Sequence, residues 1–272
     1  MCPIALSLIP LTLHLKNMNR LKQLFEQKKD PILSIYYTAG YPDLDNTLDI
    51  AEALEKAGVD FLEIGFPYSD PVADGPVIQN SSEKALHNGM TLKVLFDQLK
   101  NLRKRVSIPI LLMGYVNPLL QYGVESFCKS ASEAGVDGMI VPDLPMDEYE
   151  ELYRATFEKY GLSNIFLITP QTSEERIRKI DSLTSGFVYM VSSSATTGKN
   201  LSLSDTTEAY FSRVQAMKLK NPLIIGFGIS DKPSFQKAAK YANGAIVGSA
   251  FVKFLEQPDA KNRIGEFIAG IK

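Results

Sequence analysis

Short apolar runs alternate with amphipathic stretches from about residue 31 to the end of the chain. Each run is rich in Ile, Val, Leu or Phe, and the stretch after its turn residues carries apolar positions at helical spacing. Because the runs are apolar at consecutive positions, they are typical of parallel strands covered by helices. The predicted strands are Ile32–Thr38, Phe61–Gly65, Ile108–Tyr115, Gly138–Val141, Ile165–Ile168, Phe187–Val191, Leu223–Gly226 and Ala245–Val247.

The stretches between these runs predict helices, several of which end at a glycine. Their ranges are Thr47–Ala57, Leu92–Arg105, Glu125–Ala134, Asp147–Lys159, Glu174–Leu183, Ser204–Lys218, Ser234–Tyr241 and Ile264–Ile271. One tetrapeptide occurs twice, at Ala57–Asp60 and Ala134–Asp137, and places a glycine turn just before a strand.

Eight strand-then-helix units predict an α/β fold, a (β/α)8 TIM barrel in a single domain with extended βα loops. An open doubly wound sheet is the structural alternative. The barrel is favoured because no Gly-x-Gly-x-x-Gly motif follows the first strand and the glycine-rich strand ends come late in the chain.

The amino-terminal segment falls into two parts. Residues 1–18 are apolar and contain prolines, but they lack a basic segment and a cleavage site and are too short to span a bilayer. We expect a disordered leader or a start codon misassigned upstream of Met18, with a weak secretion signal as the alternative. Asn19–Lys29 is amphipathic and predicts a short helix that begins the barrel domain, residues 19–272.

The composition of the 272 residues narrows the class of function. Hydrophobic residues make up 45% and charged residues 22%, and 29 basic against 31 acidic residues give a net charge of -2. This balance offers no attraction to nucleic acid or to a membrane surface, so neither partner is expected. Cys2, Cys128, His14 and His87 are isolated, so we expect no disulfide and no metal site, in a reducing cytoplasm.

Glu63 interrupts an otherwise apolar predicted strand. Desolvation of a buried carboxylate raises its pKa toward the range that a general acid–base needs. A Glu that pairs with a buried base or points into solvent is the structural alternative. The loop that follows, residues 67–76, is rich in Pro and Asp and too long for a minimal turn, which predicts a functional lid with Asp74 as a second carboxylate.

Glycines cluster after the last three predicted strands, where barrels of this kind bind phosphate. Backbone amides beside a glycine approach an anion closely, and a short helix after Ser249 would add donors and a favourable dipole. The chain has no Gly-x-x-x-x-Gly-Lys-Ser/Thr loop and no Gly-x-Ser-x-Gly elbow. We therefore predict acid–base chemistry on a phosphorylated small molecule. The residues at these strand ends are Thr197, Gly198, Gly226, Phe227, Gly228, Gly248 and Ser249.

Three segments carry a specific pattern: Tyr37–Pro42, Leu62–Gln79 and Gly226–Ser230. In these segments, and from about Arg20 to Lys272 as a whole, the chain resembles the tryptophan synthase alpha subunit family. It implies a barrel that cleaves indole-3-glycerol phosphate to indole and glyceraldehyde 3-phosphate in L-tryptophan biosynthesis, a lyase reaction with no cofactor and no metal. It also implies a tryptophan synthase beta subunit as partner, in an alpha2-beta2 heterotetramer, which condenses the indole with serine.

Carried over by position, Glu63 matches the family's catalytic glutamate and Asp74 its catalytic aspartate. A retro-aldol cleavage protonates C3 of the indole and deprotonates the C3′ hydroxyl, so the resemblance implies that Glu63 shuttles protons while Asp74 stabilises charge at the indole N–H. Tyr36 and Tyr189 match positions near the indole, with a packing role as the alternative for Tyr189. The residues after the late strands match substrate-binding positions. Ser193 stands where the family often has Arg.

Two loops, residues 66–75 and 193–203, are expected to close over the substrate and signal to the partner. The partner surface would include the loop through residues 77–80 and the segment 117–119. Three alternatives stay open: another phosphate-binding barrel of the same pathway, such as an isomerase or indole-glycerol-phosphate synthase; a regulatory subunit that is weakly active alone; and a stand-alone indole-releasing lyase.

Overall fold

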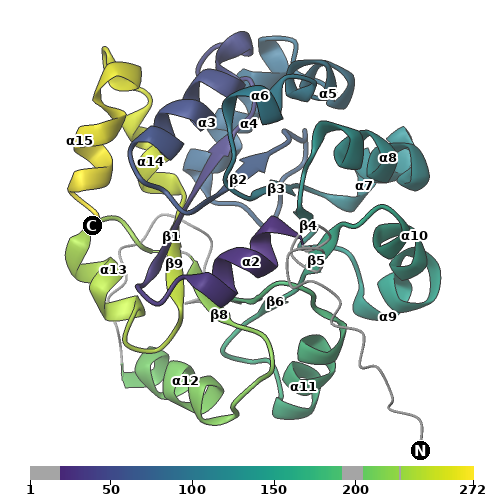
Figure 1. The fold of residues 1–272 in the computed structure, drawn as a ribbon, viewed down its shortest axis with the longest axis vertical. Helices are drawn as coiled ribbons and strands as arrows, with labels where there is room; N and C mark the ends of the chain where they lie inside the picture. The colour runs from purple at the N-terminus through teal and green to yellow at the C-terminus, as the bar shows by residue number, and fades with distance from the viewer. Residues whose placement is uncertain (1–18, 192–204, 227) are drawn as a thin grey trace, which may run out of the picture.

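The structure is a computed structural model that describes residues 19–191, 205–226 and 228–272 (Figure 1). Its strands form one sheet in the order β5-β4-β3-β2-β1-β9-β8-β7-β6. The strands at the two ends of this order, β5 (Ser163–Ile165) and β6 (Leu167–Ile168), are separated along the chain by Phe166 alone. Because its two edges are adjacent in the chain, the sheet closes into a parallel barrel ringed by helices, and the predicted (β/α)8 fold is confirmed.

The strands lie close to their predicted ranges. The predicted bounds are confirmed for β1 (Ile32–Thr38), β2 (Phe61–Gly65) and β8 (Leu223–Gly226). Bounds within two residues of the prediction are found for β3 (Ile110–Met113), β4 (Gly138–Ile140), β7 (Val188–Val191) and β9 (Gly244–Val247). The single strand predicted at residues 165–168 is wrong. The structure has two short strands on either side of Phe166: β5 pairs with β4, and β6 pairs with β7.

Helices surround the barrel (Figure 1). Six correspond one-to-one to predicted helices: α3 (Thr47–Lys56), α8 (Val124–Ala134), α11 (Glu174–Leu183), α12 (Asp205–Ala216), α13 (Lys232–Ala238) and α15 (Ile264–Ala269). The predicted helix at 92–105 is divided into α5 (Leu92–Leu99) and α6 (Leu102–Arg105). The one at 147–159 consists of α9 (Met146–Glu148), a π-helical segment η2 (Tyr149–Tyr153) and α10 (Arg154–Lys159). Two 3-10 segments are η1 (Leu44–Asn46) and η3 (Ala260–Arg263).

Two helices, α4 (Pro76–His87) and α7 (Val116–Tyr122), were not among the predicted ones. Proline at the first position of α4 suits a helix start, because its missing N–H would have no partner there. Residues 77–80 are therefore helical, and their assignment to a loop is wrong. The short helix predicted after Ser249 is α14 (Ser249–Phe254).

Helix α2 (Arg20–Gln27) lies across the amino-terminal end of the barrel (Figure 1). Leu21 is completely buried in one apolar cluster with Phe61 of β2 and with Phe187, which directly precedes β7, and the rings of Phe25 and Phe187 are 5.8 Å apart. Removing this apolar surface from water stabilises the helix against the strands. The amino-terminal end of the barrel is therefore closed by packing.

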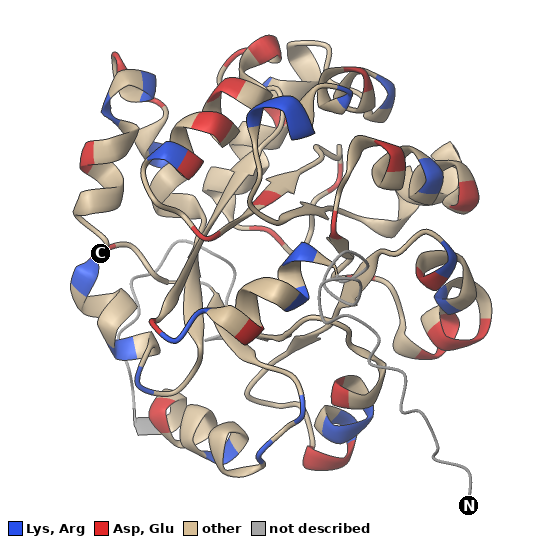
Figure 2. Ribbon diagram, in the orientation of Figure 1, with Lys and Arg blue, Asp and Glu red and all other residues tan. Residues whose placement is uncertain are grey.

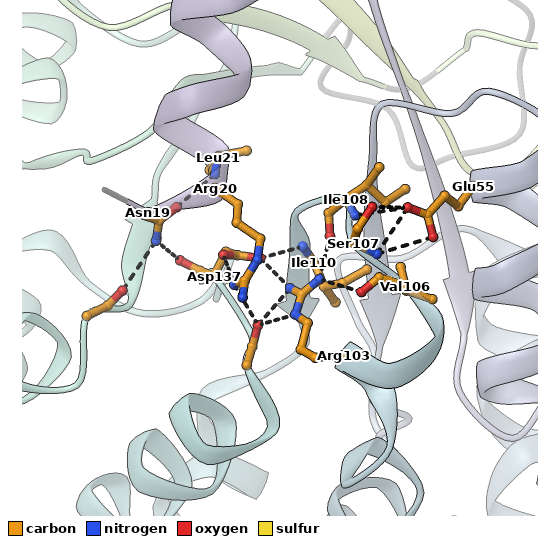
Figure 3. Close-up of polar contacts among 12 residues, drawn as sticks. Asn19, Arg20, Leu21, Glu55, Arg103, Val106, Ser107, Ile108, Ile110 and Asp137 are labelled. Atoms are coloured by element: carbon orange, nitrogen blue, oxygen red, sulfur yellow. Dashed lines mark hydrogen bonds and ion pairs between the residues drawn. The ribbon is translucent and has the colours of Figure 1, made fainter. Parts of the chain in front are cut away.

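Asp137 fastens α2 to this end of the barrel (Figure 3). Its side chain is 3% exposed, and its Oδ1 accepts from Arg20 Nη1 at 3.0 Å while its Oδ2 accepts from Arg103 Nη2 at 2.6 Å and from the Ile110 backbone N–H at 2.9 Å. Asn19 adds a bond from Nδ2 to the Asp137 carbonyl at 2.6 Å. These charge-assisted bonds give the amino-terminal end a structural role and leave the carboxyl end of the strands for chemistry.

Lys, Arg, Asp and Glu of both signs are spread over the ring of helices (Figure 2). Within the described residues, no helix has the length and apolar character needed to cross a membrane. The predicted leader, residues 1–18, lies outside the part of the chain that the structure describes.

Candidate active site

Glu63 lies on β2, directly opposite Tyr36 of β1 in the strand register. It is two residues beyond Phe61, which belongs to the barrel-interior cluster, so its side chain faces the same interior. The side chain is completely buried, and neither carboxylate oxygen has a hydrogen-bond partner among the described residues. Burial raises the pKa of Glu63 to about 8. In the described part of the chain, the alternative of a paired or solvent-facing Glu63 is wrong.

Asp74 lies in the loop between β2 and α4, at the carboxyl end of the strands. Its Oδ2 accepts a hydrogen bond of 3.1 Å from the hydroxyl of Tyr115, whose oxygen in turn accepts one of 3.0 Å from the Ala73 backbone N–H. Burial raises the pKa of Asp74 to about 6, and the bond from Tyr115 acts in the opposite direction. Tyr115 was not among the predicted site residues, although its position at the carboxyl end of the third predicted strand was a usable signal.

A small pocket opens beside this loop and is walled mainly by aromatic and apolar groups. Its lining residues are Tyr36, Phe66, Tyr68, Asp74, Ser82, Met113, Gly114, Tyr115 and Pro142. Glu63 is not among them, but its strand partner Tyr36 is. Flat apolar walls with one carboxylate suit an aromatic ring that carries a polar N–H.

Two glycines make room for two tyrosines at the strand ends. A Cβ on Gly65 would lie 2.2 Å from the Tyr36 hydroxyl oxygen, and one on Gly226 would lie 2.1 Å from the Tyr189 hydroxyl oxygen. Burial raises the pKa of both tyrosines, and the charges of Glu63 and Asp74 act in the same direction. The structure thus places Tyr36 and Tyr189 within electrostatic range of Glu63 and Asp74.

The predicted phosphate-binding residues lie partly inside the described chain. Gly226 ends β8, Gly228 follows with a φ of 76°, and Gly248 directly follows the neighbouring strand β9 and precedes Ser249, the first residue of α14. A Cβ on Gly248 would lie 3.6 Å from the Cβ of Tyr36, so this glycine borders the pocket side of β1. Thr197, Gly198, Phe227 and Ser193 lie outside the described residues.

Comparison with known proteins gives a match to the family model described as "Tryptophan synthase alpha chain" over residues 21–268. The chain belongs to the tryptophan synthase alpha chain family. It is 57% identical over 255 residues to the tryptophan synthase alpha chain of Flavobacterium johnsoniae, covering 94% of this chain and 100% of that one. It is 54% identical over 240 residues to that of Bacteroides thetaiotaomicron, covering 88% and 94% of the two chains.

Solved structures of this family share the fold. A tryptophan synthase from M. tuberculosis in its aminoacrylate-bound form matches with a TM-score of 0.81 and 32% identity, over 94% of this chain and 100% of that one. A tryptophan synthase alpha chain from Legionella pneumophila matches with a TM-score of 0.83 and 34% identity, over 93% and 96%. Membership of the tryptophan synthase alpha chain family confirms the lyase activity of the alpha reaction in tryptophan biosynthesis, and it implies a beta subunit as partner.

Proposed function

We propose that Glu63 and Asp74 carry out the acid–base chemistry by which this chain cleaves indole-3-glycerol phosphate to indole and glyceraldehyde 3-phosphate. The observation that carries the proposal is a fully buried carboxyl, Glu63, and a half-buried one, Asp74, whose pKa values are raised to about 8 and about 6. At a pH between these two pKa values, Glu63 is protonated while Asp74 is ionised. Two carboxyls held in opposite protonation states are suited to separate acid and electrostatic roles.

The reaction needs a proton at C3 of the indole and the removal of a proton from the C3′ hydroxyl. Glu63 donates the first proton as its carboxylic acid and then, as a carboxylate, takes the hydroxyl proton, so that the C3–C3′ bond breaks and its electron pair returns to the ring. Asp74 stabilises the positive charge that the ring nitrogen carries meanwhile. The proton count balances, since Glu63 ends in the state in which it began.

Substrate binding uses the groups around these carboxyls. Tyr36 and Tyr189 contact the indole, and the backbone at Gly226, Gly228, Gly248 and Ser249 receives the phosphate, supported by the glycine-rich ends of two adjacent strands. The family resemblance assigns Thr197, Gly198 and Phe227 to the same phosphate-binding region. We assign no cofactor and no metal to this site, and we assign residues 19–272 to one catalytic domain in the cytoplasm.

We further propose that the chain passes indole to the beta subunit within an alpha2-beta2 heterotetramer. The segments 77–80 on α4 and 117–119 on α7 would contribute to the contact surface. Two exposed apolar side chains support this location, because Val72 precedes α4 and is 82% exposed while Leu120 on α7 is 47% exposed. A partner seated on these two helices would remove both apolar side chains from water.

Indole release from indole-3-glycerol phosphate, with and without the cognate beta subunit, tests the function. We expect slow turnover by the chain alone, a sharp rise with the partner, and loss of release in a Glu63→Gln variant that unfolds at an unchanged urea concentration. Fast turnover alone would favour a stand-alone lyase. An inactive wild-type chain under both conditions, or a fully active Glu63→Gln variant, would overturn the proposed mechanism.

A further inference from the structure

Tyr115 lies between β3 and α7, and its buried hydroxyl contacts two consecutive residues of the loop that carries Asp74. We propose that Tyr115 is the positioning residue for Asp74, holding Oδ2 as an acceptor and leaving Oδ1 to face the substrate. The proposal rests on the role proposed above for Asp74. Among the described residues, no hydrogen bond to the other carboxylate oxygen competes with this assignment.

The direction of the two hydrogen bonds follows from their chemistry. The Ala73 backbone N–H can only donate, so at 3.0 Å the Tyr115 oxygen is its acceptor. A tyrosine hydroxyl has one proton, and the carboxylate oxygen at 3.1 Å receives it. The Tyr115 hydroxyl therefore makes both of its hydrogen bonds to the loop that carries Asp74. The bond to Asp74 favours the ionised form of the carboxyl.

The ring of Tyr115 is held by its surroundings. It packs on the ring of Tyr68 with centroids 5.3 Å apart, and the Tyr68 hydroxyl accepts a bond of 3.0 Å from Asn117 Nδ2. On the other side of the turn, the Val116 backbone N–H donates to Asp143 Oδ1 at 2.9 Å. The bond to Asp143 therefore holds the turn after β3 through a residue outside the Asp74 loop, as a positioning group requires.

The same turn also holds the start of the loop. A Cβ on Gly114 would lie 2.2 Å from the Phe66 ring, which therefore occupies the space beside the Gly114 backbone, and the Phe66 N–H donates to the Met113 carbonyl at 2.9 Å. The loop therefore contacts the β3–α7 turn at its first residue, Phe66, and again at Ala73 and Asp74.

Removal of the Tyr115 hydroxyl has a predictable electrostatic effect. Burial already raises the pKa of Asp74 to about 6, and loss of the opposing hydrogen bond raises that pKa further. Asp74 acts as an anion, so the rate falls as the pH drops through its pKa, and a higher pKa moves this acid limb upward. The other titratable groups facing this region stay in place: Tyr36 on β1, Glu63 on β2, Tyr189 on β7, Asp143 after β4, and Tyr68 in the loop itself.

The test compares kcat/KM for indole release from indole-3-glycerol phosphate between pH 5.5 and 8 in the wild type and in Tyr115→Phe. We expect the acid limb of the variant to lie about one pH unit higher. The ratio of wild-type to variant kcat/KM is then about five at pH 6 and under two at pH 7.5. Tyr68→Phe is the matched control, because it loses a hydroxyl of the same loop that does not contact Asp74; its ratio to wild type stays constant with pH.

A constant ratio for Tyr115→Phe, or an equal shift in Tyr68→Phe, would overturn the positioning role. Asp74→Asn separates this failure from that of the proposed function. If Asp74→Asn loses indole release while Tyr115→Phe keeps the wild-type acid limb, only the positioning role is lost. If Asp74→Asn retains wild-type release, the role of Asp74 and the inference that depends on it both fail.

Discussion

Tyr36 and Glu63 are register partners on β1 and β2, so a partly buried phenol and a fully buried carboxyl lie side by side in the barrel. Burial raises the pKa of Tyr36, and the charges of Asp74 and Glu63 raise it further. Tyr36 therefore keeps its proton over the whole range in which the two carboxyls titrate. The pH dependence of kcat/KM then reflects the titration of Glu63 and Asp74.

The first prediction is a bell-shaped pH profile of kcat/KM. Asp74, with its pKa near 6, must be ionised, so the rate rises with pH through about 6; Glu63, with its pKa near 8, must be protonated, so the rate falls above about 8. Steady-state indole release over pH 5 to 9 measures both limbs. Asp70→Asn, an exposed carboxyl of the same loop, should keep both limbs, and a flat wild-type profile between pH 5.5 and 8.5 would contradict the assignment.

The second prediction concerns Gly226. Because a Cβ there would lie 2.1 Å from the Tyr189 hydroxyl oxygen, Gly226→Ala must displace Tyr189. We expect a loss of about 1–3 kcal/mol in the free energy of unfolding, together with a lower kcat/KM. Urea unfolding and indole release measure the two effects. Gly265→Ala in α15 is the control, since its Cβ would meet nothing within 4 Å, and an equal loss in both variants would refute the steric argument.

The third prediction concerns Asp137 at the amino-terminal end. Asp137→Asn leaves the partly buried Arg103 without its charged partner and weakens the attachment of α2 through Arg20, so we expect a loss of about 3 kcal/mol in the free energy of unfolding. Asp97→Asn removes an exposed ion pair with Lys100 and should change the free energy of unfolding far less than Asp137→Asn does.

The folded Asp137→Asn variant should keep the wild-type kcat/KM, because the site lies at the other end of the strands. Measurement at a temperature where the protein is fully folded separates the two effects. A large loss of kcat/KM without a loss of stability would show that the amino-terminal end takes part in catalysis.

The fourth prediction concerns the partner surface. Leu120→Glu places a charge on an exposed apolar position of α7, so we expect the beta subunit to stimulate indole release less in this variant, while turnover by the chain alone is unchanged. Titration of the beta subunit against indole release measures the effect. Leu152→Glu, at a position 63% exposed in η2, should be stimulated by the beta subunit as the wild type is. Equal stimulation of both variants would show that Leu120 is not part of the partner surface.

The repeated tetrapeptide shows what a sequence repeat can and cannot reveal. Both copies do form glycine turns before strands, with φ of 87° at Gly58 and 82° at Gly135. The aspartates of the two copies also make equivalent hydrogen bonds. Asp60 Oδ2 accepts one from the Leu33 N–H at 2.8 Å, and Asp137 Oδ2 accepts one from the Ile110 N–H at 2.9 Å. The turn was predictable because it depends on neighbouring residues, whereas the bond to an adjacent strand depends on the closed sheet.

Two errors in the predicted elements differ in their physical origin. The helix predicted from Ser234 begins earlier, at Lys232, because Asp231 and Ser234 form a capping box. The predicted fifth strand is divided at Phe166, where pairing with β4 on one side ends and pairing with β7 on the other side begins. A capping box is a signal in the sequence, but a change of strand partner is decided by contacts with residues far away in the chain.

By itself the sequence determined the strand-and-helix alternation, the barrel, and Glu63 and Asp74 as the carboxyls of interest, because runs of apolar residues and a charge that interrupts them are local features. Only the tertiary structure decided that Glu63 lies opposite Tyr36 and that Tyr115 binds Asp74, a residue 41 positions away. The physical reason is that burial periodicity is set within a few residues, whereas hydrogen-bond partners and pKa shifts depend on which distant side chains the closed barrel brings within 3–4 Å.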